Sequence, residues 1–389
     1  MEIFSIVRFL LFKTYERRSQ MNKMLNCLAN KVMCTAVVAL GAFAASAESV
    51  LTTNALYDAV NTDVSVGYQV SGLEGDEIAV VFTNDACEVI NWKVPARLND
   101  VQFLVVGGGG GGGGGALSAY AGAGGGGGGV VTGSVFHLKK NSVMDIKVGS
   151  GGERGYVEDN STGYASGKKG EDSVFSVNKI LYVRAPGGGG DTGYNTIGGT
   201  GGSNSGSRKA NKSPALHSFE EFETNLTYMV AQVFGNRGGE TQTAASGGGG
   251  GGALEPGYPG KGSTNKDNPI PYIAGDGGAG LTNSITGIEV VYGSGGGGGQ
   301  AHHLNTSSTT KAGLGGSGAG SGGRYYSKSS TAYGVDATSG NDNQGGGGGG
   351  GFARSHYGFA SSNGGNGGSG IVVFRYKDPI KPGFKVIVR

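Results

Sequence analysis

The chain has 389 residues, of which 84 are glycine, 9 are proline and 3 are cysteine, and its formal net charge is +2 at pH 7. Glycine is about three times as frequent as in average proteins. Because it follows no strict period of three and proline is scarce, a collagen triple helix is excluded. The 17 tyrosines, 15 phenylalanines and several Val/Ile-rich stretches also argue against a purely flexible linker.

Residues 1–47 predict an N-terminal extension followed by an export signal. Lys23 and Lys31 precede the apolar stretch 32–45, and Ala45-Ser46-Ala47 has the small residues of a signal cleavage site. The apolar stretch is shorter than the ~20 residues that a membrane-spanning helix needs. We therefore expect cleavage near Ala47, no membrane span in the mature chain, and a secreted or cell-surface protein. The start of translation stays open between Met1, Met21 and Met24.

The mature chain predicted by this cleavage is slightly acidic. Six basic and two acidic residues leave with the signal, which moves the net charge from +2 to −2. Nucleic acid is therefore not an expected partner, because such binding depends on basic surface. Cys87 alone remains among the cysteines, so no internal disulfide is expected.

Short stretches rich in β-branched and aromatic residues predict an all-β fold. Lys139-Lys140-Asn141 predicts a hairpin turn between two of them. Many short strands separated by turns favour an antiparallel β-sandwich over a parallel α/β sheet. The last strand is far from the others in sequence, and we expect it to pair with the early strands and close the sandwich. Residues 48–75 are expected to be an extension and 377–389 a tail. The predicted strands are 77–83, 87–94, 101–106, 129–138, 142–148, 173–176, 179–184 and 371–376.

Glycine runs dominate a long predicted insert, residues 187–369. Polyglycine has no side chains to bury and loses much backbone entropy on folding. One ordered solution is a bundle of polyglycine II-type helices, which are extended, have three residues per turn, and bond their amides to neighbouring helices. The alternative is a set of flexible connectors. The bundle is favoured because the strand 101–106 runs directly into the glycines that begin at Gly107.

One short α-helix is also predicted. Apolar residues recur every three or four positions over 216–234, after the N-cap and proline pair Ser213-Pro214. Such a stripe either packs against the rest of the fold or binds a partner or a membrane surface. The residues of the stripe are Leu216, Phe219, Phe222, Leu226, Met229, Val233 and Phe234.

Motifs that carry chemistry are not found in their required contexts. Gly107, Gly109 and Gly112 have the spacing of a dinucleotide-binding loop, but no helix follows to hold a pyrophosphate. The five histidines lack metal-ligand spacing. We therefore expect no enzyme activity, no cofactor and no metal. Tyrosines between the glycine runs are candidate ligand contacts, with covering of the bundle as the alternative. They are Tyr258, Tyr272, Tyr292, Tyr325, Tyr326 and Tyr357.

Four stretches, 94–115, 124–152, 274–299 and 367–376, resemble a known family. In each, a β-rich sequence runs directly into or out of a glycine run. They are similar to the glycine-rich domains of bacterial and phage surface and tail-fibre proteins. They are also similar to the glycine-rich region of the anaplastic lymphoma kinase receptors, in which a sandwich like that of tumour necrosis factor carries polyglycine helices. The resemblance implies that fold and a surface location, and it implies no catalytic residues.

Two functions follow as hypotheses. The first is an adhesin-like binding module that recognises a glycan or a protein through tyrosine-rich loops. The second is a structural protein of the envelope or extracellular matrix that has no discrete ligand and associates with itself.

Overall fold

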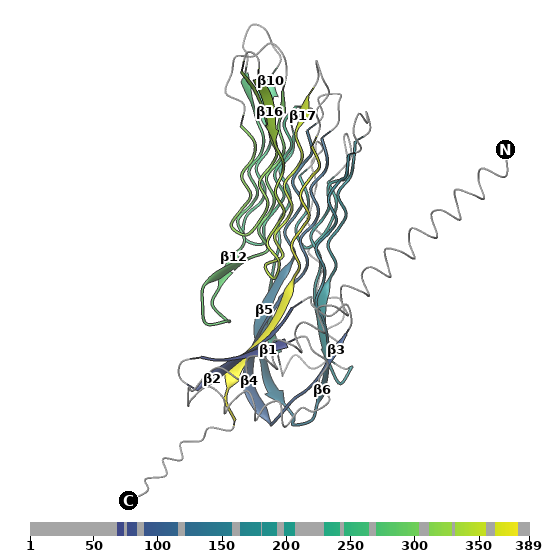
Figure 1. Cartoon of the computed structure of the whole chain (residues 1–389). Helices are drawn as coiled ribbons and strands as arrows, with labels where there is room; N and C mark the ends of the chain where they lie inside the picture. Colours follow the sequence, from purple (N-terminus) through teal and green to yellow (C-terminus); the bar gives the residue numbers. More distant parts are fainter. Residues whose placement is uncertain are drawn as a thin grey trace, which may run out of the picture. The chain divides into compact units, whose positions relative to one another are not determined.

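The computed structural model describes most of the chain from residue 68 onward (Figure 1). In this described part every regular element is a β-strand, which confirms the all-β prediction, and no helix is present. The described residues are 68–73, 76–83, 89–115, 121–157, 164–179, 181–192, 198–206, 229–241, 245–263, 270–302, 311–328, 331–354 and 362–379.

The larger sheet has six antiparallel strands, and the last strand of the chain lies within it. Val373 pairs with Val81 on one side and with Leu104 on the other. The prediction that the last strand pairs with the early strands is therefore confirmed. The strand order is β1 (Tyr68–Gly72), β2 (Glu77–Phe82), β18 (Ile371–Lys377), β4 (Leu98–Val106), β5 (Val130–Leu138) and β9 (Met229–Phe234).

The smaller sheet has four antiparallel strands, all of which the sequence predicted. Their order is β3 (Ile90–Lys93), β6 (Val143–Lys147), β7 (Ser173–Val177) and β8 (Leu181–Ala185). The predicted turn between β5 and β6 is confirmed as well. Asn141 has a φ of 63°, which asparagine tolerates better than most residues. The amide of Ser142 donates to the carbonyl of Lys139 at 3.1 Å.

Aromatic rings join the two sheets. Trp92 of β3 stacks on Phe374 of β18, with ring centroids 6.0 Å apart and planes 6° apart. Phe175 of β7 meets Phe374 edge-on at 5.0 Å and Phe103 of β4 at 5.3 Å. All four side chains are fully buried. Offset and edge-on ring pairs stabilise a core beyond simple area burial, so this layer holds the sheets face to face.

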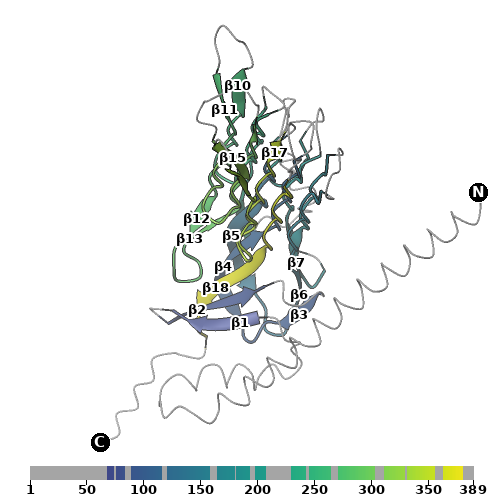
Figure 2. The ribbon, with the colours of Figure 1, turned by 45° about the horizontal axis from the view of Figure 1, so that its top comes forward.

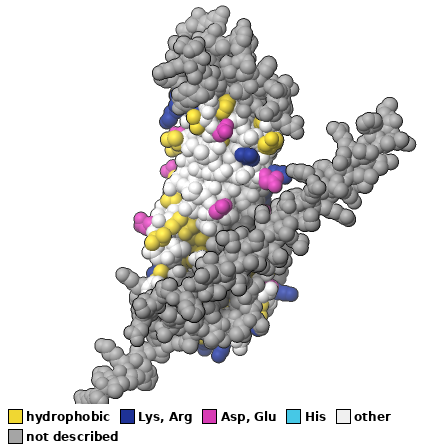
Figure 3. Space-filling view, viewed as in Figure 1, with side chains coloured by type: hydrophobic (Ala, Val, Ile, Leu, Met, Phe, Trp, Pro, Cys, Tyr) yellow, Lys and Arg dark blue, Asp and Glu magenta, His cyan; other side chains and the backbone are white. Residues whose placement is uncertain are grey.

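The opposite face of the six-stranded sheet carries a second core. There Leu104 and Val373 contact Ile285 and Tyr292, which come from the hairpin formed by β12 (Leu281–Asn283) and β13 (Val290–Tyr292). Apolar side chains also gather on the surface where this hairpin lies (Figure 3). Because β4 is covered on both faces, its second half is a continuous apolar run and does not alternate.

The predicted α-helix is wrong for residues 229–234. This stretch is the edge strand β9, in which Val233 pairs with Val131 of β5. Met229 is buried, whereas Val230 is 59% exposed, so the side chains alternate as in a strand. Over six residues an apolar pattern fits both periods, and pairing with the open edge of β5 decides between them. Residues 216–228 of the predicted helix lie outside the described residues.

Beyond the strands, glycine-rich segments run side by side (Figures 1 and 2). We call residues 107–115, which continue β4, the central segment. Its amides donate to three antiparallel neighbours in strict rotation. Gly107, Gly110 and Gly113 donate to Gly129, Gly126 and Ala123; Gly108, Gly111 and Gly114 donate to Glu171, Lys168 and Ala165; Gly109, Gly112 and Gly115 donate to Gly368, Gly365 and Ser362.

Three further neighbours run parallel to the central segment and donate to its carbonyls. The amides of Gly188, Gly152 and Gly348 donate to the carbonyls of Gly108, Gly109 and Gly110, at 2.8 to 2.9 Å. The central segment therefore has six hydrogen-bonded neighbours, and its buried amides are paired as buried backbone requires. Residues 295–300 repeat the three-residue rotation, donating in turn to Gly278, Gly125, Gly320, Gly275, Gly122 and Gly323.

Close approach explains why the central segment is all glycine. A Cβ added at Gly109, Gly110 or Gly111 would lie 2.0 to 2.1 Å from a carbonyl oxygen of a neighbouring backbone. At the surface glycine stays at buried positions three residues apart, and outward-facing positions between them take side chains. In residues 148–157, for example, Gly152 and Gly155 are buried, whereas Glu153 and Tyr156 are exposed.

Short strand pairs lie along the glycine segments at the end away from the sheets (Figure 1). They were not predicted, because each has only two to five residues and no extended run of β-formers. The pairs are β10 (Lys261–Ser263) with β11 (Ile270–Ile273), β14 (Ala301–His302) with β17 (Ala353–Arg354), and β15 (Arg324–Lys328) with β16 (Thr331–Val335).

Replacing a glycine of the central segment is predicted to lower the free energy of unfolding far more than replacing a glycine that has space around its Cα. Gly110→Ala places a Cβ 2.1 Å from the oxygen of Gly189, and only backbone movement relieves the contact. We expect a loss of about 3 kcal/mol or more in the free energy of unfolding, measured by urea denaturation. The control is Gly72→Ala in β1, where a Cβ has no neighbour within 4 Å. Equal stability of the two variants would contradict the packing described above.

Candidate functional site

The far end of the glycine segments, away from the sheets, is the candidate functional site. The amide of Gly115 donates to the carbonyl of Ser362 at 3.0 Å, and that of Ala301 donates to Ala245 at 2.7 Å. Ala301 also pairs with Ala353 where β14 meets β17. These bonds fix the points from which the chain leaves the glycine segments and to which it returns. The connecting sequences that start or end there include 116–120, 242–244, 303–310 and 355–361.

The candidate tyrosines are not brought together in one place. Tyr272 is 1% exposed and packs against Ala245, Ala301 and Ala353 near the far end. Tyr292 is also 1% exposed and belongs to the core over the six-stranded sheet. Both rings are therefore structural and do not reach the surface. Burial raises the pKa of Tyr292, and a hydrogen bond with Thr286 partly opposes this.

The structure describes the side chain of one remaining candidate tyrosine, the backbone of two others, and no part of the fourth. Tyr258 is 54% exposed, and it lies between Gly257 and Pro259, which line a small hollow of about 250 Å³. The backbone of Tyr325 and Tyr326 belongs to β15. Tyr357 lies outside the described residues. Among candidate tyrosines whose side chains are described, Tyr258 is thus the exposed one.

A buried carboxylate, which the sequence did not reveal, ties three segments together near the far end. Asp191 is 2% exposed, and its Oδ2 accepts the amide of Ala123 at 3.0 Å and the hydroxyl of Tyr164. The amide of Asp191 donates to the carbonyl of Gly111 at 3.1 Å. These residues precede or follow the connecting sequences 116–120, 158–163 and 193–197.

The side chain of Asp191 accepts the next hydrogen bond in a series whose other acceptors are backbone carbonyls. The amides of Gly129 and Gly126 donate to the carbonyls of Pro186 and Gly189, one bond every three residues. The next amide in that series is Ala123, and it bonds to the Asp191 side chain. A lone acidic residue after a glycine run carries no sequence signal for this role, because the pairing depends on segments far apart in the chain.

The environment of Tyr164 keeps its phenol protonated. Loss of hydration raises the pKa of Tyr164 well above its usual value, and the negative charge of Asp191 and their hydrogen bond raise it further. A backbone contact with Ala123 opposes the shift. Tyr164 therefore stays a hydrogen-bond donor to Asp191 over the whole neutral range.

A family model described as a glycine-rich domain matches residues 83–377, more than half of the chain. The chain belongs to the glycine-rich domain family. The match begins directly after β2 and ends on the last residue of β18. It therefore includes all the described glycine segments and the far end. No curated protein matched the chain.

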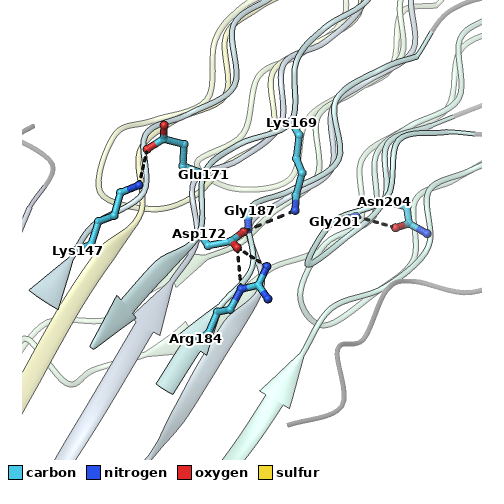
Figure 4. A network of polar contacts seen from close by, with 8 residues as sticks. All are labelled: Lys147, Lys169, Glu171, Asp172, Arg184, Gly187, Gly201 and Asn204. Carbon is cyan, nitrogen blue, oxygen red and sulfur yellow. Dashed lines mark hydrogen bonds and ion pairs between the residues drawn. The ribbon is translucent and has the colours of Figure 1, made fainter. Parts of the chain in front are cut away.

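The glycine-rich domain has a second polar cluster where the smaller sheet meets the glycine segments (Figure 4). Asp172 accepts the Gly187 amide at 2.8 Å and the Arg184 Nε at 2.7 Å, and Lys169 lies 3.6 Å from its carboxylate. Burial alone would raise the pKa of Asp172, but these three partners stabilise the carboxylate and lower the pKa below its usual value. The cluster fixes the direction in which residues 187–190 leave β8.

The described part of the glycine-rich domain also bears on metal binding and membrane insertion. Within those ranges no three His, Cys, Asp or Glu side chains come together in a way that would hold a metal ion. No helix there has the length and apolar character needed to cross a membrane. His137 makes an exposed contact with Asn99, with 2.9 Å between Nδ1 and Oδ1.

Removing the Asp172 charge is predicted to make the free energy of unfolding less dependent on pH between pH 7 and pH 3. Because the folded-state pKa is lowered, the contribution of Asp172 is complete above about pH 4 and is lost as the pH falls below that value. We expect Asp172→Asn to lose about 1–2 kcal/mol of unfolding free energy at pH 7, and less at pH 3. Glu171→Gln is the control, because its ion pair with Lys147, at 3.5 Å, is half exposed. A deficit at pH 3 as large as at pH 7 would contradict this role.

Tyr164→Phe is predicted to be destabilising near neutrality and less so in alkali. The loss at pH 7 is expected to be about 1 kcal/mol, because Asp191 loses a donor. Above about pH 10 the unfolded wild type ionises its phenol while the folded protein does not, so the wild type alone loses that stability. Urea denaturation between pH 7 and 11 measures the difference, with half-exposed Tyr182→Phe as the control at pH 7. A difference that stays constant with pH would count against the assignment.

Proposed function

We propose that this protein is an exported, non-enzymatic display module, adhesin-like, that recognises a glycan or a protein at the far end of its glycine segments. The observation that carries the proposal is the three-residue rotation of hydrogen bonds in residues 107–115. A segment bonded to six neighbours cannot shift without breaking many bonds together. The far end is thus a fixed platform for the sequences that connect the segments.

The finer description of the fold is part of the same proposal. We take the glycine segments to be polyglycine II-type helices with three residues per turn, and the rotation of hydrogen-bond partners supports this geometry. We take the two sheets to be a sandwich of the jelly-roll or tumour-necrosis-factor type. Support comes from the aromatic layer between the sheets and from β18, which lies next to β2.

A fixed platform favours binding by sequences of the kind found in the connections. Residues 303–310 are rich in Ser, Thr and Asn, and residues 355–361 carry Tyr357 and Phe359. Recognition loops use such residues for flat contact area and adaptable hydrogen bonds. Anchoring both ends of a loop lowers the entropy lost on binding, which raises affinity. Export rests on the signal-like residues 1–47, and a secreted or surface location is proposed on that basis.

The structural alternative is a protein of the envelope or matrix that associates with itself and has no discrete ligand. Paired backbone groups throughout a rigid bundle would serve that role equally well. The two functions differ in what the soluble chain does, because a matrix protein assembles without an added ligand.

The display function predicts that binding depends on the platform. Residues 48–389 would be applied to a glycan array and to intact cells. Wild type and Gly72→Ala are expected to bind the same targets, whereas Gly110→Ala is expected to lose binding because the ends of the connections are no longer fixed. Absence of binding by the folded wild type, together with self-association in analytical ultracentrifugation, would contradict display and support the matrix role.

A further inference from the structure

A polar groove of about 480 Å³ lies on the outer face of the six-stranded sheet, beside the hairpin of β12 and β13. Its residues come from the strands and the hairpin, and none belongs to the far end. We propose that this groove binds a neutral saccharide, that is, a ligand that presents several hydroxyl groups. This is a second site, and it does not depend on binding at the far end.

The floor of the groove is set by strand register. Arg375 of β18 pairs with Gln102 of β4, Gln102 pairs with Ser134 of β5, and Ser134 pairs with Val230 of β9. Paired residues point to the same face of a sheet, so these four side chains form one row across four strands. Thr132 and Gln232, paired across β5 and β9, belong to the next row on the same face.

The hairpin supplies the opposite wall and leaves the floor open. Thr282, Asn283, Ser284 and Glu289 line this side. The Oδ1 of Asn283 accepts the Ile285 amide at 2.8 Å, which leaves its NH₂ group as a donor. The buried core begins directly beside the groove, so the hairpin is held over β4 and cannot collapse onto the polar rows.

Arg375 makes one end of the groove rigid and nearly neutral. Its Nε donates to the Glu77 carboxylate at 2.7 Å, and its Nη1 donates to the Ser284 carbonyl at 3.2 Å. The guanidinium therefore ties β18, β2 and the hairpin together. Because Glu77 compensates its charge, the groove has no excess positive charge with which to attract an anion.

The groups that remain match hydroxyls better than other ligand chemistry. Within the part of the chain that the structure describes, the side chains of Gln102, Ser134, Gln232 and Thr282 make no hydrogen bond. Amides offer a donor and an acceptor side by side, as neighbouring sugar hydroxyls require. Val230, at 59% exposure, adds an apolar contact for the carbon face of a sugar ring. The volume falls in the range of small-ligand sites, whereas the polar lining is unsuited to an apolar ligand.

The test is isothermal titration of residues 48–389 with glucose, galactose, N-acetylglucosamine, cellobiose, lactose and chitobiose. At least one is expected to bind, and Gln102→Ala and Gln232→Ala are each expected to weaken it about fivefold, the effect of one lost hydrogen bond. Thr282→Val tests the hairpin wall with little change in shape. Gln69→Ala is the matched control, because Gln69 is exposed on β1 of the same sheet, outside the groove.

Two results would overturn the proposal. One is that no saccharide in this set binds to the folded chain. The other is binding that the Gln102, Gln232 and Thr282 variants leave unchanged, which would place the saccharide elsewhere. The second result would be compatible with recognition at the far end, so it would reject the groove without rejecting the display function. Thermal unfolding of each variant confirms that a loss of binding is not a loss of fold.

Discussion

The pairing of backbone amides in segments without side chains is the constraint on which the structure depends. A glycine segment buries almost nothing but its own peptide groups, and each unpaired group in the interior would cost free energy. In residues 107–115 the amides solve this by rotating among three neighbours, while three others donate to the carbonyls. Such an arrangement admits no Cβ at its centre, as the contacts around Gly110 show. Composition, spacing and rigidity thus have one physical origin.

The sheets determine how the segments begin. Val106 pairs with Val130 at the end of β4 and β5, and the next residue pair, Gly107 and Gly129, is joined by an amide–carbonyl bond of 3.0 Å. The antiparallel pairing of the sheet therefore continues into the glycine segments without a break. The aromatic layer under β18 fixes the strands, and the Asp172 cluster fixes the exit from β8. At the other end, Asp191 extends the pairing by one side chain.

Much of the strand framework could be predicted from sequence, because β4, β5 and β18 are runs of β-branched and aromatic residues. The path from Val106 into Gly107 also pointed to ordered glycine. The predicted helix is wrong at Met229–Phe234, because pairing with the open edge of β5 outweighs the local apolar pattern. β1 was assigned to an extension because its residues, Tyr68–Gly72, are mixed. Which glycine segments lie next to one another is revealed only by the long-range hydrogen bonds.

The functional side chains were harder to predict than the fold. Tyr292 and Tyr258 both lie next to glycine in the sequence, yet Tyr292 is buried in a core and Tyr258 is exposed. Asp191 and the groove around Gln102 depend on residues that are brought together from distant parts of the chain.

The rotation of hydrogen-bond partners implies that the glycine segments form one cooperative hydrogen-bonded unit. Amide hydrogen exchange of residues 107–115, compared with that of β4, measures this cooperativity. The amides of these glycines are expected to be protected almost as strongly as those of Phe103 and Val105. Exchange of the glycines at the unfolded rate, while β4 remains protected, would contradict it.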